Sequence, residues 1–135
     1  MSDYVIDASA VVLALSGKST GSEALRARLP GMHLHAPHLV DAEVGNVLRR
    51  HERAGLISER DASTALAVAP ALVHHRYPHI GPLGERAWQR RHNLTYYDAL
   101  YVTLAEHLGA PLLTCDARLS RASGPMVRVE LVEEI

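Results

Sequence analysis

The feature that most restricts the fold is a set of short, largely apolar segments, each separated from the next by a longer connection. Because these segments lack the polar alternation of a sheet with one wet face, they indicate strands that are covered on both faces. Long helical connections between such strands predict a parallel sheet flanked by helices, an α/β fold of four to five strands. The predicted strands are 4–7, 32–36, 112–114 and 126–132, with "HHRYPHI" as a further short extended piece.

The connections carry recognisable helix signals. Thr95 is a candidate N-cap, and Ser58 opens a segment with an acidic residue three positions later. Gly55 follows a run of apolar residues at spacings of three and four, so it is a natural helix end. The predicted helices are 9–15, 22–29, 39–54, 58 to 68 or 73, 82–91 and 95–107.

Length and composition favour one soluble domain that spans residues 1–135. No apolar run approaches the ~20 residues of a membrane helix, and no positive region precedes an apolar stretch at the N-terminus. The single cysteine fits a reducing compartment, so we expect a cytoplasmic protein with no membrane association. The net charge of −1 excludes a global basic field, so any nucleic-acid contact must come from local patches.

Two acidic residues follow predicted strands directly. Asp7 ends "YVID" and Asp116 ends "LLTCD". In open parallel sheets, ligands bind beyond the carboxyl ends of the strands, so these two carboxylates are expected to share one cleft. The alternative is that each acid simply caps the turn after its strand.

Two further acids, Glu43 and Asp98, lie near the starts of predicted helices among apolar neighbours. Acids are favoured at helix N-termini by the helix dipole alone, so a structural role is the alternative here too. An ionised carboxylate in apolar surroundings is costly unless it is paired or bound to metal, and Lys18 is the only lysine. Four converging carboxylates would repel each other, and Mg²⁺ or Mn²⁺ with oxygen ligands would relieve that repulsion.

Three segments, "VIDASA", "PHLVDAEVGNVLRR" and "LTYYDALYVTLAEHLGAPLLTCDARL", together resemble the PIN domain family, and within it the VapC-like toxins of bacterial toxin–antitoxin pairs. The resemblance covers nearly the whole chain, and residues 94–119 are its most specific part. It implies an α/β/α fold and a Mg²⁺-dependent endoribonuclease in which Mn²⁺ can substitute. It carries the catalytic and metal-binding acids onto Asp7, Glu43, Asp98 and Asp116, and the hydroxyls that line the site onto Ser9 and Thr114.

The resemblance also implies partners, namely an RNA substrate, a second copy in a homodimer, and a VapB-like antitoxin that pushes an arginine-bearing tail into the acidic groove. Two other functions stay open. The acidic cleft could bind a basic partner without cleaving RNA in the cell. The segment "VIDAS" is also similar to the first strand of haloacid-dehalogenase-like phosphatases, although Ser9 stands where the second acid of those enzymes is expected.

Arginines flank two of the candidate acids in sequence. Such charges usually form a solvated surface, but their closeness to the acids suggests contacts with RNA phosphates. The candidates are Arg49, Arg50, Arg90 and Arg91.

Six of the nine histidines lie in "HLHAPH" and "HHRYPH". Neither segment contains a helical metal motif such as HExxH. We therefore expect a loop or edge-strand surface there, with a zinc site as the alternative.

Overall fold

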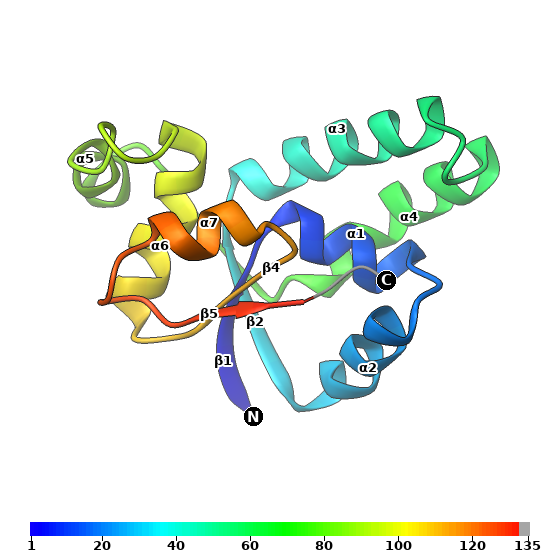
Figure 1. The fold of residues 1–135 in the computed structure, drawn as a ribbon, viewed down its shortest axis with the longest axis horizontal. Coiled ribbons are helices and arrows are strands. Elements are labelled where there is room, and N and C mark those ends of the chain that lie inside the picture. The colour runs from blue at the N-terminus through cyan, green and yellow to red at the C-terminus, as the bar shows by residue number, and fades with distance from the viewer. Residues whose placement is uncertain (133–135) are drawn as a thin grey trace.

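The computed structural model describes residues 1–132 and contains a five-stranded sheet with helices on both faces (Figure 1). Every neighbouring pair of strands is parallel, and the spatial order is β3-β2-β1-β4-β5. The predicted α/β class is therefore confirmed. The strands are β1 (Ser2–Ile6), β2 (Met32–Pro37), β3 (His75–Tyr77), β4 (Leu112–Thr114) and β5 (Val129–Leu131).

The predicted helices are present with ends that differ by a few residues, and one further helix was not predicted. That helix, α7, has six residues and buries only Leu119, so it leaves no periodic apolar pattern to detect. The α-helices are α1 (Ala8–Ser16), α2 (Thr20–Arg28), α3 (Leu39–Arg53), α4 (Glu59–Leu72), α5 (Pro82–Trp88), α6 (Tyr96–Leu108) and α7 (Ala117–Ala122), and a 3₁₀ turn, η1 (Leu29–Gly31), precedes β2.

The helix caps and helix ends predicted from the sequence are present in the structure. Thr95 Oγ1 accepts the backbone N–H of Asp98 at 3.1 Å and so begins α6. Ser58 Oγ accepts the backbone N–H of Asp61 at 3.0 Å at the start of α4. Gly55 and Gly109 follow α3 and α6 with φ of 75° and 61°, a left-handed conformation that suits glycine and ends each helix.

Side chains on β3 show how the two faces are covered. Arg76 Nε and Nη2 donate to the carboxylate of Asp41 in α3 at 2.7 and 2.9 Å, whereas its neighbour Tyr77 lines a hollow with Thr103 and Leu104 of α6. Because neighbouring side chains on a strand point to opposite faces, α3 and α6 lie on opposite sides of the sheet. Figure 1 shows α3 and α4 extending from one end of the molecule and α5 at the other.

The core fills the space between the sheet and these helices. Its largest fully buried side chains include Ile6 of β1, Leu113 of β4 and Tyr101 of α6. Within residues 1–132, no helix is both long and apolar enough to cross a bilayer.

Candidate active site

The strand order of the sheet switches direction at the junction of β1 and β4. The chain builds outward from β1 to β2 and β3, and then returns to add β4 on the other side of β1. Ile6 and Leu113 are partners across this junction, so Asp7 and Thr114 follow at the same carboxyl edge, with Asp116 two residues further. This is the position where open α/β sheets bind ligands, and the structure brings both strand-end acids to it.

Asp7 is 8% exposed and is held on both carboxylate oxygens. Ser9 Oγ donates to its Oδ1 at 2.6 Å, and the backbone N–H of Ala10 donates to the same oxygen at 3.0 Å. Thr114 Oγ1 donates to Oδ2. Burial raises the pKa of Asp7, these hydrogen bonds oppose the rise, and the charge of Asp98 adds to it.

Glu43 lies in the second turn of α3 and faces the same region. The hydroxyl of Tyr101, a buried residue of α6, donates to Glu43 Oε1 at 2.7 Å. Partial burial raises the pKa of Glu43, and the charges of Asp98 and Asp7 raise it further. The pKa of Tyr101 is also raised, first by burial and then by the charge of Glu43, so its phenol stays protonated and remains a donor.

Asp98 and Asp116 share one cationic partner, Arg118. Its Nη2 lies 3.0 Å from Asp98 Oδ2 and 3.0 Å from Asp116 Oδ2. The two carboxylates raise the pKa of Arg118, with the hydrogen bond to Asp98 as the largest cause. The guanidinium is more than half exposed, so it neutralises the acids from the solvent side and can move without breaking core contacts.

Contacts and charge interactions link the four acids. The charge of Asp98 acts on Asp7 and Glu43, the charge of Asp7 acts on Glu43, and Arg118 joins Asp98 to Asp116. Asp7 also caps α1, and Asp116 caps α7 by accepting the N–H groups of Arg118 and Leu119 at 2.9 and 3.3 Å. The sequence left a helix cap and a site ligand as alternative roles for these two acids. In the structure each of the two carboxylates caps a helix and also lies in the cluster.

The donor set of this cluster fits a hard divalent cation. All four side chains offer carboxylate oxygens, the ligands of Mg²⁺ and Mn²⁺. Burial is the largest cause of the raised pKa values of Asp7 and Glu43, and the charges of neighbouring acids add to it. The Asp7 carboxylate has about four acceptor positions, and three of them accept hydrogen bonds. One position is left for a metal. In the part of the chain that the structure describes, no three of these acids have ligand atoms all within 4.8 Å of one another.

The arginines proposed from the sequence occupy different surroundings. Arg49 and Arg50 are exposed on α3, and the charge of Arg50 acts on Glu43. Arg90 instead pairs with Glu106 of α6 at 2.9 Å, and the guanidinium of Arg91 lies 4.7 Å from the centre of the Trp88 ring. Their contact with RNA stays a prediction.

Sequence reasoning missed Tyr101 and Arg118. Tyr101 lies three positions after Asp98 in a helix, and that spacing places the two residues on one face, so the signal was available. Arg118 follows Asp116 by two residues, but its role depends on α7, which the sequence did not predict.

Comparisons with known proteins show to which family the chain belongs. A family model described as "PIN domain" matches residues 4–125. Ribonuclease VapC1 of Mycobacterium tuberculosis is 50% identical over 132 residues, which cover 98% of this chain and 99% of that protein. The crystal structure of PAE2754 from Pyrobaculum aerophilum has a TM-score of 0.66 at 27% identity and covers 95% of this chain and 90% of that one.

The same fold occurs in VapBC2 from Rickettsia felis, solved with a DNA fragment from its promoter, with a TM-score of 0.68 at 13% identity and coverage of 96% and 98%. A likeness at 13% sequence identity shows the fold alone. The family match and the relative at 50% identity both extend over nearly all of the chain. The chain therefore belongs to the PIN domain family and, within it, to the VapC proteins.

Proposed function

We propose that this protein is a divalent-metal-dependent endoribonuclease and the toxin of a VapBC-type pair. The observation that carries the proposal is that Asp7 and Asp116 lie beyond the carboxyl ends of β1 and β4, with Asp98 joined to Asp116 through Arg118. Its support is the 50% identity to a protein named Ribonuclease VapC1. The phosphatase alternative is disfavoured because Ser9 uses its hydroxyl to hold Asp7 and to accept the N–H of Cys115.

We assign the metal-binding role to Asp7, Asp98 and Asp116, with Glu43 completing the site. A bound Mg²⁺ or Mn²⁺ would make a water molecule more acidic and would neutralise charge on the phosphorane-like transition state. Ser9 and Thr114 keep Asp7 in place for that ion. These roles follow from the donor chemistry of the cluster and from the family resemblance.

Glu43 is assigned a proton-handling role. Its raised pKa makes it a better proton acceptor than an ordinary surface glutamate, and the Tyr101 hydroxyl fixes its orientation. Arg118 is assigned to the scissile phosphate, because it is exposed and already lies beside two of the acids. In the free protein the same arginine acts as their counter-charge.

The test is cleavage of a structured RNA by purified protein with Mg²⁺ or Mn²⁺. Cleavage should stop with EDTA, and Asp98→Asn should reduce it by more than ~10²-fold. Asp41→Asn is the matched control, because Asp41 is also paired with an arginine but on α3, and it should cleave like the parent. Cleavage that survives both EDTA and Asp98→Asn contradicts the proposal.

The toxin assignment has its own test. Expression of this chain should slow bacterial growth, and co-expression of its VapB-like partner should restore it. The acidic cluster suits a basic segment of such a partner, which would displace Arg118 from Asp98 and Asp116. Asp98→Asn should remove the growth effect, whereas unimpaired growth with abundant folded parent protein would contradict the toxin role.

A further inference from the structure

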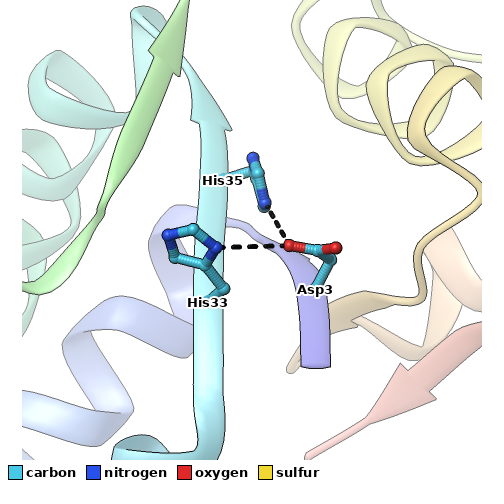
Figure 2. A group of neighbouring side chains, drawn as sticks. All are labelled: Asp3, His33 and His35. Atoms are coloured by element: carbon cyan, nitrogen blue, oxygen red, sulfur yellow. Dashed lines mark hydrogen bonds and ion pairs between the residues drawn. The ribbon is translucent and has the colours of Figure 1, made fainter. Parts of the chain in front are cut away.

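A second group of metal-ligating side chains lies on one face of β1, β2 and β3. Asp3 and His33 are partners in the pairing of β1 and β2, and His35 and His75 are partners in the pairing of β2 and β3. Since residues two apart on a strand point to the same face, His33 and His35 project together toward Asp3. Figure 2 shows both imidazole rings turned to one oxygen of the Asp3 carboxylate.

The distances in this group suit a small ion. His35 Nε2 lies 2.8 Å from Asp3 Oδ1, and His33 Nδ1 lies 3.4 Å from the same oxygen. The three ligand atoms all lie within 4.8 Å of one another. A tetrahedral zinc ion with bonds near 2.1 Å holds its ligand atoms about 3.4 Å apart, so small side-chain movements would complete the geometry.

The remaining ring nitrogens already have partners that orient the rings. His35 Nδ1 lies 2.8 Å from the Tyr77 hydroxyl, and His33 Nε2 lies 3.0 Å from His75 Nε2. When a histidine binds metal through one nitrogen, the other normally donates to such a partner, which sets the tautomer and the ring orientation. Tyr77 and His75 would accept these two N–H groups.

The types of side chain in the group also suit a metal. The rings of His35, His74 and His75 have centroids 4.6 to 5.3 Å from that of His33, so four imidazoles gather beside the Asp3 carboxylate. Neutral imidazole and ionised carboxylate are the forms that bind metal.

Access from solvent is open on one side. The side chain of His35 is 9% exposed, that of His33 is 37% exposed and that of Asp3 is 59% exposed. The buried histidine would anchor the ion, and the two outer ligands would leave a fourth position for water. Among residues 1–132, this is the one group of three such side chains whose ligand atoms come so close together.

We propose that Asp3, His33 and His35 bind a zinc-class divalent transition-metal ion at a site separate from the acidic cluster. Two imidazoles and one carboxylate favour Zn²⁺ or Co²⁺ over Mg²⁺, which prefers oxygen ligands throughout. Asp3 precedes Asp7 by four residues of extended chain, which places the two sites about 13 Å apart. The ion would tie β1 to β2 and stabilise the folded chain by mass action.

The test is titration of the tag-free parent protein with Zn²⁺ by calorimetry, and with Co²⁺ by visible absorption, in excess Mg²⁺ that occupies the acidic cluster. One ion should bind, the Co²⁺ spectrum should be that of a tetrahedral or five-coordinate site, and Zn²⁺ should raise the melting temperature. Asp3→Ala and His33→Ala should each weaken Zn²⁺ binding by more than ~10-fold. Both side chains are partly exposed, so these variants should keep the parent's circular dichroism.

Two controls separate this site from other sources of zinc affinity. His92→Ala removes an exposed histidine outside the group, and Asp7→Asn alters the acidic cluster; both should bind Zn²⁺ like the parent. The proposal is overturned if no ion binds, if binding is unchanged in both Asp3→Ala and His33→Ala, or if Asp7→Asn abolishes it. RNA cleavage need not be measured, so failure here is independent of the proposed nuclease.

Discussion

Thr114 donates a hydrogen bond to the carboxylate of Asp7 and so connects the carboxyl ends of two neighbouring strands, β4 and β1. The same hydroxyl oxygen accepts the backbone N–H of Asp116 at 3.0 Å. One side chain therefore holds two of the four acids. Because Thr114 is fully buried, water cannot replace either bond when the hydroxyl is removed.

Replacing Thr114 with valine should destabilise the protein by about 1–3 kcal/mol near neutral pH, because Asp7 would stay buried with one donor fewer. The lost bond favours the ionised acid, so the folded pKa of Asp7 should rise further above its unfolded value of about 4. The loss of stability is therefore complete above the folded pKa of Asp7 and disappears below about pH 4, where Asp7 is protonated in both states. Urea unfolding at several pH values measures it.

Thr114→Ser is the matched control because it keeps the hydroxyl. Its stability should stay much closer to that of the parent, and its pH dependence should be that of the parent. Equal stability of the serine and valine variants at neutral pH would show that the hydrogen bond to Asp7 contributes nothing.

Replacing Asp98 with asparagine should leave the metal-free protein equally stable or more stable near neutral pH. The charge of Asp98 raises the pKa values of Asp7 and Glu43, and a raised carboxyl pKa penalises the folded state at every pH above the unfolded value of about 4. The lost ion pair with Arg118 offsets little of this gain because it is exposed. Melting curves in EDTA and in Mn²⁺ provide the measurement.

The same variant should show a smaller rise in melting temperature with Mn²⁺ than the parent, because it lacks one proposed ligand. Asp41→Asn removes an arginine-paired carboxylate outside the cluster and should keep the full response. A parent protein whose melting temperature does not move with millimolar-scale Mn²⁺ would refute the metal site.

Arg118→Gln should strengthen Mn²⁺ binding roughly two- to tenfold at low ionic strength, because the guanidinium competes electrostatically with a cation at Asp98 and Asp116. RNA cleavage should nevertheless fall, since the proposed phosphate contact is lost. Titration with Mn²⁺ at two salt concentrations checks the first effect, and the difference from the parent should shrink in high salt.

Arg121→Gln changes an arginine of the same short helix and serves as the control. It should bind Mn²⁺ like the parent. If Arg118→Gln weakens metal binding instead, Arg118 supports the acids in the metal-bound state and its assignment as a competing counter-charge is wrong.

His74→Asn should reduce the loss of stability that the parent shows on acidification. His74 Nδ1 accepts the backbone N–H of Leu34 at 2.9 Å, and the pKa of His74 is lowered by partial desolvation and by the neighbouring histidines. A lowered histidine pKa costs stability as the pH falls through the unfolded value of about 6.5, and the cost levels off below the folded pKa. Asparagine can accept the same N–H without titrating.

Urea unfolding at about pH 7.5 and about pH 5 compares the variant with the parent, on either side of the unfolded histidine pKa. His92→Asn, at an exposed position, should follow the parent. An identical acid response of His74→Asn and the parent would exclude a role for this hydrogen bond.

The sequence by itself determined the parallel α/β architecture and the placement of Asp7 and Asp116 beyond strand ends. These features depend on local apolar runs and on the rule that parallel strands share a carboxyl edge, so neighbouring residues suffice to predict them. The caps at Ser58 and Thr95 were predictable for the same reason, because a cap and its N–H partner lie three residues apart.

Only the tertiary structure decided which side chains meet across long stretches of chain. Tyr101 reaches Glu43 because α6 and α3 both approach the open edge of the sheet, and Arg118 reaches Asp98 because the unpredicted α7 turns it there. The grouping of Asp3 with His33 and His35 depends on the register between β1 and β2. A register shift of one residue would turn these side chains to opposite faces, and composition and spacing carry no information about that register.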